Sequence, residues 1–295
     1  MPELLTTDEA AAYLRLSERK LYDLIAAGAV PCTKVTGRWL FPRVALDRWV
    51  IAGLVAPAAL ARGQAPPIIG GSHDPLLEWA LRESGCGLAN LPEGSEEGLR
   101  RLSRGEVIAA AIHLHHLDHG DEEANLVTVA HAPGLHDAVV IAFARREQGI
   151  LVGPGNPLGL IDVASIARGG VRMAQRPSGA GAQLLLLALI ARAGLSMDAF
   201  KFIKSVCPTG ADIAQAIRSQ RADCGIATRS VALAAGLDFL PLVWENFDLV
   251  LRQRDYFLPG PQTFFRFVYS NAFRERAREF GGYDIQAASE VRLVN

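Results

Sequence analysis

From residue 68 to the C-terminus, short apolar runs alternate with amphipathic segments, and this alternation restricts the fold more than any other feature of the chain. The runs that read as strands are residues 68–69, 107–112, 139–143, 171–174, 225–227 and 239–243. Helices are predicted for residues 76–83, 95–104, 182–193, 211–220 and 231–236. Strands that alternate with helices form βα units, so we expect an α/β fold with a mostly parallel sheet covered on both faces. The segment of residues 68–295 is longer than one such sheet with its helices requires, which favours two lobes.

Residues 5–50 carry a different set of signals, those of a small helical unit. Thr6 precedes Glu9 by three residues, the spacing of a capping box, which predicts a helix beginning near Thr7. Ser17 is the expected N-cap of a second helix, which Gly28 ends. The apolar positions of that helix are Leu21, Leu24 and Ile25, which share one face and leave the opposite side exposed.

A small hairpin is predicted for residues 34–41, turning at Thr36-Gly37, and Pro42 then opens a third helix. The order helix, turn, helix, wing, helix suits a unit that places its second helix in a DNA major groove while a basic wing touches phosphate. The candidate DNA contacts are Ser17, Arg19, Lys20 and Tyr22 on the second helix, with Lys34 and Arg38 in the wing.

At this point the sequence resembles the excisionase/MerR-like winged helix-turn-helix family. The positions that carry the resemblance are Leu5, Thr7, residues 9–11, Leu14, Ser17, residues 21–25, Gly28, Val30, Pro31, Lys34 and residues 37–41. The resemblance implies double-stranded DNA as a partner. Through Val50 there are seven Lys/Arg against six Asp/Glu, so one copy attracts the DNA phosphates only weakly. We therefore expect a homodimer or higher homo-oligomer on one operator.

The composition and net charge of the chain exclude several classes of protein. A net charge of −1 excludes a general polyanion binder, and 50% hydrophobic residues are ordinary for a chain with a large core. No basic leader segment or run of eighteen apolar residues occurs, so we expect a cytoplasmic chain without membrane partners. The four cysteines lack CxxC spacing, which favours reduced, buried thiols.

Three junctions between strands and helices carry glycines and hydroxyls, where the amides of a helix N-terminus point outward. They are residues 70–75, residues 175–181 and residues 207–210. Such junctions bind anions and lie at the carboxyl ends of strands, where open α/β sheets hold ligands. The candidate ligand residues are Ser72, His73, His113, Arg176, Ser178, Gly179, Gly181 and Thr209.

Residues 68 to about 284 resemble the periplasmic-binding-protein-like, molybdate-binding-like effector domain that is fused to excisionase-type regulators. The strings that carry the resemblance are GSHDPLLEWAL, GNPLG, RPSGAGAQLLL, ADCGIA and GLDFLPLVWENFDLV. The resemblance implies a two-lobed type II binding domain with crossing segments near residues 139–149 and 240–251, and a small oxyanion such as molybdate or tungstate as ligand. Where that family commonly has RxxGSGTR, this chain continues from Arg176 to Gly179-Ala180-Gly181-Ala182-Gln183, so two hydroxyls and one guanidinium are missing. Each missing donor costs about 1 to 3 kcal/mol, so a small organic acid stays an alternative ligand.

The sequence carries partial signals of two other kinds of chemistry, metal binding and catalysis. Four histidines and Asp118 lie within residues 113–119, but one strand end and turn spread these side chains in several directions, so no metal is assigned and the question stays open. Ser72-His73-Asp74 are consecutive and cannot form a catalytic relay, and no catalytic motif occurs, so we expect no enzyme and no cofactor.

The expected organisation is therefore a winged helix-turn-helix domain over residues 1–52, a linker over 53–67 and a ligand-binding domain over 68–295. Its first lobe is predicted to comprise residues 68–140 and 245–295, and its second lobe residues 141–244. The linker is rich in Ala, Gly and Pro, and residues 52–62 could extend the third helix into a dimer contact. The functional prediction is a ligand-responsive transcriptional regulator, with a DNA-tethered scaffold that binds no ligand as the alternative.

Overall fold

The computed structural model describes residues 4–35, 37–52, 64–115, 123–168 and 170–295. Contacts within the chain divide it into two compact units, Met1–Arg62 and Gly63–Asn295, which are described separately. Most of the predicted linker, and the predicted extension of the third helix over residues 53–62, lie outside the described residues.

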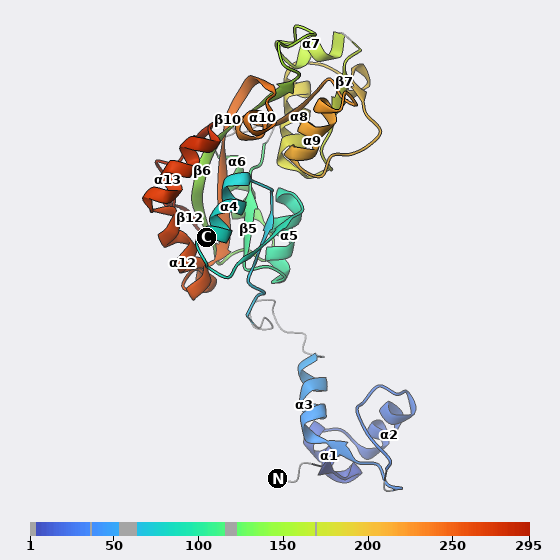
Figure 1. Ribbon diagram of the computed structural model, residues 1–295. Helices are drawn as coiled ribbons and strands as arrows, with labels where there is room; N and C mark the ends of the chain where they lie inside the picture. Colours follow the sequence, from blue (N-terminus) through green and yellow to red (C-terminus); the bar gives the residue numbers. More distant parts are fainter. Residues whose placement is uncertain (1–3, 36, 53–63, 116–122, 169) are drawn as a thin grey trace. The chain divides into compact units, whose positions relative to one another are not determined.

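The first unit contains three helices and a two-stranded sheet (Figure 1). Its elements are β1 (Leu4–Leu5), α1 (Thr7–Leu14), α2 (Glu18–Ala26), β2 (Phe41–Pro42) and α3 (Arg43–Ala52), with β1 antiparallel to β2. The Thr6 amide donates to Glu9 Oε2 at 2.8 Å, so the predicted capping box starts α1. Ser17 Oγ accepts from the Lys20 amide at 3.3 Å and caps α2, as predicted.

A small core holds these elements together. It consists of Leu5, Ala10, Ala11, Leu21, Val30, Phe41 and Leu46. Gly28 has φ +64°, a left-handed conformation that glycine adopts without strain, and it lies just beyond the end of α2. Thr33 and Leu40 form a β-bridge that closes the wing, whereas Thr36 of the predicted turn lies outside the described residues. The predicted order of helix, turn, helix, wing and helix is therefore observed.

The second unit is a mixed α/β structure. Its strands are β3 (Ile68–Gly71), β4 (Ala89–Pro92), β5 (Ala109–Ile112), β6 (Ala138–Val152), β7 (Arg172–Ala174), β8 (Lys201–Phe202), β9 (Cys224–Thr228), β10 (Asp238–Arg252), β11 (Tyr283–Asp284) and β12 (Val291–Val294). Its helices are α4 (Pro75–Glu83), α5 (Ser95–Arg104), α6 (Ala124–His131), α7 (Val163–Arg168), α8 (Gly181–Arg192), α9 (Gly210–Arg218), α10 (Arg229–Ala235), α11 (Gln253–Tyr256), α12 (Pro259–Val268) and α13 (Asn271–Phe280), with a 3-10 turn at Met197–Ala199.

Two long antiparallel strands organise this unit. β6 and β10 each have 15 residues and pair from Asp238↔Val152 to Arg252↔Ala138, in a sheet of order β4-β3-β5-β10-β6-β9-β7-β8. β3 is parallel to β4 and β5, and β7 is parallel to β8 and β9, but every pairing of β6 or β10 is antiparallel. The expectation of a mostly parallel sheet is therefore wrong for its centre, where the crossing segments predicted near residues 139–149 and 240–251 run as continuous strands.

β5 shows why helices cover both faces of the first lobe. Its alternate residues Ala109 and Ala111 pack in a core with α4, α12 and α13, while Ala110 and Ile112 pack in a second core with α5 and α6. Because successive side chains of a strand point to opposite faces, a continuous apolar run requires cover on both sides. Figure 1 shows α4, α12 and α13 near one another, and α5 on the other side of β5.

The second lobe repeats this arrangement around β9. Ile226 packs in a core with α7 and α8, and its neighbour Ala227 packs in a core with α9 and α10. Along β6, the last side chain in a first-lobe core is Ala144 and the first in a second-lobe core is Ile150. The change of lobe therefore falls between these residues, a little later than the predicted boundary at residues 140/141.

The two lobes contact each other directly. A Cβ atom on Gly94, just before α5, would lie 3.2 Å from the Gly179 carbonyl oxygen of the second lobe. Leu184 of α8 packs against the first-lobe core that contains Leu99 and Val129. The lobes are therefore closed. Among the described residues no helix is long and apolar enough to cross a membrane, and Cys32, Cys86, Cys207 and Cys224 are all free.

Candidate functional site

A small polar cavity lies where the two lobes meet the crossing strands. Its lining residues are Ser72, His73, Pro75, His113, Arg146, Gln148, Arg176, Ala180, Gly181, Ala182, Gly210, Ala227, Thr228 and Val231. Its volume is about 20 Å³, which is room for a water molecule or two. A ligand of several heavy atoms therefore enters only when the lobes move apart.

Three helices begin at this cavity. Pro75 opens α4, Gly181 opens α8 and Gly210 opens α9, and all three residues line the cavity. The first amides of a helix have no intrahelical acceptor and form the positive end of its dipole. The Asp74 carboxylate already caps α4, where it accepts from the Leu77 amide at 2.9 Å. The positive ends of α8 and α9 therefore suit a ligand with negative oxygens.

Arg146 of β6 is the most heavily contacted charged group at the cavity, with only 1% of its surface exposed. Its Nε donates to Glu245 Oε1 at 2.6 Å, its Nη1 to Asp74 Oδ2 at 2.8 Å and its Nη2 to His113 Nδ1 at 2.7 Å. The guanidinium also lies 4.2 Å from the centroid of the Phe247 ring. Burial alone would lower the pKa of Arg146, but the two carboxylates raise it above its ordinary value.

His113 follows β5 and brings its ring into the cavity. A guanidinium can only donate, so Nδ1 accepts from Arg146 and the neutral ring carries its proton on Nε2. His113 Nε2 is buried and has no hydrogen-bond partner among the described residues. Burial, assisted by the Arg146 charge, holds the pKa of His113 well below its ordinary value although Glu245 opposes the shift. At neutral pH this ring is therefore an uncharged donor facing the cavity.

A buried acid and a second histidine complete the cluster. His115 Nε2 lies 2.8 Å from Glu245 Oε2, and the Tyr283 hydroxyl donates to Asp74 Oδ2 at 2.9 Å. Burial would raise the pKa of Glu245, but the nearby His113, Arg146 and His115 lower it well below its usual range. Asp74 and Glu245 thus both accept hydrogen bonds from Arg146.

Arg176 supplies a second cation at the cavity. Its backbone amide donates to Gln183 Oε1 at 3.0 Å and its Nη2 donates to the Pro208 carbonyl at 2.7 Å. The Arg176 Nε is buried without a partner in the part of the chain that the structure describes. Burial, with the Arg146 charge, lowers the pKa of Arg176 to about 10, so the side chain remains a cation at neutral pH. Arg176 is half-buried, and a cation with a buried, free donor stabilises a bound anion.

Gln148 closes the cavity from the crossing strand. Its Nε2 donates to Glu245 Oε1 at 3.0 Å, and its Oε1 is buried with no partner among the residues described. The cavity therefore presents two free donors, on His113 and Arg176, and one free acceptor, on Gln148.

The predicted ligand residues divide into two groups. Ser72, His73, His113, Arg176 and Gly181 line the cavity, whereas Ser178, Gly179 and Thr209 do not. Ser178 is exposed and lies with Gly179 beside the start of α5, while Thr209 accepts from the Asp212 amide at 3.2 Å as the N-cap of α9. The Ser72 hydroxyl lies 2.7 Å from Ser95 Oγ. Ligand contact by all eight residues stays a prediction.

Sequence reasoning missed four residues of the cluster, which are Asp74, Arg146, Gln148 and Glu245. The available signal was the polar stretch at residues 145–148, flanked by apolar residues 138–144 and 149–152. Charged residues in the middle of a buried strand require partners. Recognising residues 138–152 as one continuous strand would therefore have predicted a polar site there.

The histidine-rich segment gives no metal site among the described residues, where no group of three or more possible ligands was found. His116, Asp118 and His119 lie outside the described residues, so the question left open for residues 113–119 stays open. His113 and His115 contact Arg146 and Glu245 in the cluster described above.

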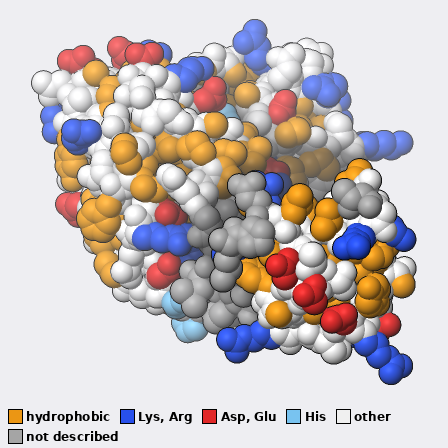
Figure 2. All heavy atoms as spheres, turned by 90° about the horizontal axis from the view of Figure 1, so that it is seen from below, with side chains coloured by type: hydrophobic (Ala, Val, Ile, Leu, Met, Phe, Trp, Pro, Cys, Tyr) orange, Lys and Arg blue, Asp and Glu red, His pale blue; other side chains and the backbone are white. Residues whose placement is uncertain are grey.

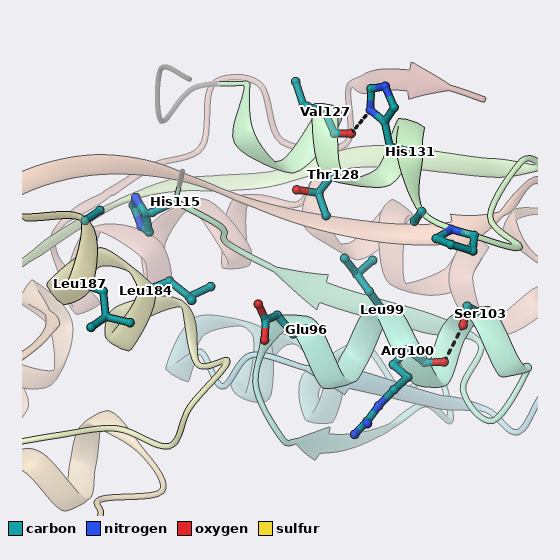
Figure 3. A pocket seen from close by; sticks show the side chains of 13 residues that line it. Glu96, Leu99, Arg100, Ser103, His115, Val127, Thr128, His131, Leu184 and Leu187 are labelled. Atoms are coloured by element: carbon teal, nitrogen blue, oxygen red, sulfur yellow. Dashed lines mark hydrogen bonds between the residues drawn. The ribbon is translucent and has the colours of Figure 1, made fainter. Parts of the chain in front are cut away.

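A second, larger cavity of about 970 Å³ lies between α5 and α6 of the first lobe and α8 of the second (Figure 3). Leu99, Val127, Leu184 and Leu187 give it a largely apolar wall. His131 Nδ1 is 2.8 Å from the Val127 carbonyl, as the dashed line in Figure 3 marks. The described lining is mostly apolar, so this cavity suits an apolar group better than a small anion.

In the first unit, the predicted DNA contacts lie on the surface. Arg19, Lys20 and Tyr22 are exposed on α2, whose Leu21 is fully buried. Ser17 caps that helix, so its hydroxyl already has a structural role. The predicted phosphate contacts in the wing, Lys34 and Arg38, are also exposed. Both basic and acidic side chains are visible on the face of the molecule in Figure 2. DNA contact by these six residues stays a prediction.

Comparisons with known proteins agree with this division into units. Residues 78–269 match the family model described as the PBP superfamily domain, and residues 4–52 match that of a helix-turn-helix domain. The predicted combination of the two domains is thereby confirmed. "Uncharacterized protein YvgK" of Bacillus subtilis (strain 168) is 22% identical over 304 residues, covering 98% of this chain and 97% of that protein.

Solved structures resemble the second unit. A phosphate ABC transporter substrate-binding protein with bound phosphate, from Clostridium perfringens, gives a TM-score of 0.54 at 11% identity, covering 72% of this chain and 96% of that one. The tungstate ABC transporter from Geobacter sulfurreducens gives 0.51 at 13% identity, with coverages of 72% and 97%. At these identities the likeness shows the fold alone.

Proposed function

We propose that this chain, which belongs to the PBP superfamily through residues 78–269, is a transcriptional regulator that binds a small anion between its two lobes. The helix-turn-helix domain at residues 4–52 would bind DNA, and the second unit would sense the ligand. The proposal assigns no catalytic step to the chain. We also propose that the chain acts in the cytoplasm, where its DNA target would lie. It would bind that DNA as a homodimer or higher homo-oligomer.

One observation carries the ligand half of the proposal. Free donors on His113 and Arg176 face the same cavity as the starts of α4, α8 and α9. A buried donor without a partner costs about 1 to 3 kcal/mol, so such groups are expected to serve a ligand or an ordered water. Donors and helix N-termini both favour a ligand with ionised oxygens.

The fold of the second unit supports the same class of ligand. The similar protein from Clostridium perfringens holds phosphate, and the one from Geobacter sulfurreducens is named for tungstate. We favour a tetrahedral oxyanion over a small organic acid because the closed cavity, of about 20 Å³, must widen less for the smaller ligand. Molybdate and tungstate remain members of this class.

The competing proposal is a DNA-tethered scaffold whose second unit binds no ligand. It predicts a closed or apolar cleft. The cleft is indeed closed, but its wall contains Arg146, Arg176, His113 and Gln148 and is not apolar. Keeping this polar cluster in a scaffold would leave three buried polar atoms without partners, which argues for the sensor.

Regulation would follow from lobe closure. A ligand that binds the closed form better than the open form shifts the equilibrium between them, by a coupling of about 1 to 3 kcal/mol in typical allosteric proteins. In a homo-oligomer, this shift would change the spacing or orientation of paired helix-turn-helix domains and so the affinity for an operator.

The experiment is a thermal-shift titration of the full chain with phosphate, sulfate, molybdate and tungstate and, in parallel, with small organic acids. We expect one of the oxyanions to raise the unfolding temperature, and Arg176→Ala to remove this effect. Arg172→Ala is the matched control, because Arg172 pairs with Asp223 at 2.6 Å in the same lobe but does not line the cavity. If no anion stabilises the chain, or if Arg176→Ala keeps the full shift, the sensor proposal is wrong.

A further inference from the structure

Gln148 offers an accepting oxygen, which needs a hydrogen-bond donor from a ligand. An anion whose oxygens are all ionised has no such donor. Gln148 lies in the second half of β6, where it pairs with Val243 of β10 and Thr228 of β9, and only 2% of its surface is exposed. Gln148 lines the cavity, and its Oε1 is a buried acceptor that has no partner in the described part of the chain.

The orientation of this amide is fixed by its neighbour. Gln148 Nε2 donates to Glu245 Oε1 at 3.0 Å, and Arg146 Nε donates to the same oxygen at 2.6 Å. The pKa of Glu245 lies well below its usual range, so its carboxylate only accepts. Exchanging the oxygen and nitrogen of Gln148 would place Oε1 against this carboxylate. Oε1 is therefore the amide atom that remains to accept a hydrogen bond from a ligand.

An ordered water can donate to Gln148 Oε1 while the cavity is empty of ligand. A ligand that displaces this water loses affinity unless it supplies the same hydrogen bond. The other free groups, His113 Nε2 and Arg176 Nε, both donate. The complementary ligand therefore has several accepting oxygens and one O–H donor on the same small molecule.

Resting on the function proposed above, we infer that the ligand is a tetrahedral oxyanion that keeps one proton at neutral pH, as hydrogen phosphate and hydrogen arsenate do. Gln148 is then the residue that selects it. Sulfate, molybdate and tungstate have the same shape but carry no proton at this pH, so one of their oxygens would face the Gln148 oxygen at hydrogen-bond distance. An acceptor facing an acceptor loses the bond and adds repulsion, so we expect discrimination of about tenfold or more.

The test is isothermal titration of the full chain with sodium phosphate, sodium sulfate and sodium tungstate at pH 7.5. We expect phosphate to bind at least about tenfold more tightly than sulfate or tungstate. If sulfate or tungstate binds as tightly as phosphate, this inference is overturned while the sensor proposal stands. If none of the three anions binds, this inference is overturned, and the thermal-shift titration with molybdate and the organic acids then decides the sensor proposal.

Variants then assign the selectivity to one atom. Gln148→Met keeps the length of the side chain but removes its acceptor, and we expect the ratio of phosphate to sulfate affinity to fall about tenfold, towards one. Gln215→Met, on the exposed side of α9, is the matched control and should keep the wild-type ratio. An unchanged ratio in Gln148→Met, in a variant that unfolds at the wild-type temperature, would overturn the assignment. Should that variant fail to fold, the wild-type ratio still decides the inference.

Discussion

Gly181, the first residue of α8, lies so close to His113 that a methyl group on its Cα would be 2.1 Å from both Cδ2 and Nε2 of the ring. The same methyl group would be 2.3 Å from the His113 carbonyl oxygen, which belongs to the backbone and cannot rotate away. Glycine at this position is therefore what allows a second-lobe helix to meet the first lobe at the cavity.

Gly181→Ala should weaken the closed form of the second unit. Alanine suits a helix better than glycine, so any loss of stability must come from the contact with His113 rather than from helix propensity. We expect a loss of about 1 to 3 kcal/mol in the free energy of unfolding, as for other overpacked sites, measured by urea denaturation.

Gly153→Ala is the control for that experiment, because its added methyl group would meet only Pro157, at 3.9 Å. It should leave the free energy of unfolding within about 0.5 kcal/mol of the wild-type value. Equal stability of the two variants would show that the lobes do not close in the way described here.

Arg146→Met should destabilise the chain strongly. The substitution removes the partner of two buried carboxylates, Asp74 and Glu245, while keeping most of the apolar volume. Breaking a buried ion pair from one side typically costs about 3 to 5 kcal/mol, and we expect a loss in this range in urea denaturation at pH 7.5.

Arg82→Met provides the comparison, since Arg82 is largely exposed and pairs with Glu78 one turn away on α4. A surface pair of this kind contributes about 0 to 1 kcal/mol. A loss at Arg146 no larger than that at Arg82 would contradict the role given to the buried cluster.

Some features of the molecule were predictable because their causes are local. The capping box of Thr6 and Glu9, the Ser17 cap and the left-handed Gly28 depend on residues within one turn of each other, and all three are observed. Likewise, the starts of α4 and α9 follow from Asp74-Pro75 and from Thr209 with Asp212. The type of each helix and strand predicted in this way agrees with the structure.

The site was harder to predict because its partners are far apart in the chain. Arg146 contacts Asp74 from 72 residues before it and Glu245 from 99 residues after it. Its charged stretch interrupts an apolar run, so the sequence suggested a short strand ending near residue 143, whereas β6 continues to Val152. No local pattern states which distant residue will neutralise a buried charge.

His113→Asn should change how stability depends on pH. The folded-state pKa of His113 is well below its ordinary value, so below about pH 6.5 the unfolded chain binds a proton that the folded chain does not. Stability should therefore fall as pH drops through this window, by up to about 1.4 kcal/mol per pH unit from this residue. Asparagine cannot be protonated, and its oxygen can still accept from Arg146.

The measurement is the free energy of unfolding in urea at pH 7.5, 6.5 and 5.5 for both proteins. The wild type should lose more stability than His113→Asn between pH 6.5 and 5.5. His131→Asn is the control, because His131 is on α6 and outside the cluster. Parallel pH profiles for wild type and His113→Asn would contradict a buried, neutral His113.

The predicted DNA contacts are of two kinds, base-reading side chains on α2 and phosphate-contacting side chains in the wing. Arg19 and Lys20 are on the exposed side of α2, and Lys34 is in the wing. A side chain that reads bases affects selectivity, whereas one that touches phosphate weakens binding to all sequences and lowers the salt dependence by about one unit of slope. We therefore expect the Arg19→Ala/Lys20→Ala double variant to lose its preference for the operator over unrelated DNA.

Lys34→Ala should instead weaken operator and unrelated DNA by similar factors, with a shallower dependence of affinity on salt. Fluorescence anisotropy at three salt concentrations distinguishes the two outcomes. Arg82→Ala, in the other unit, is the control and should bind as the wild type does. A double variant that keeps full operator preference would remove α2 from the groove, because no other exposed cationic pair is present on that helix among the described residues.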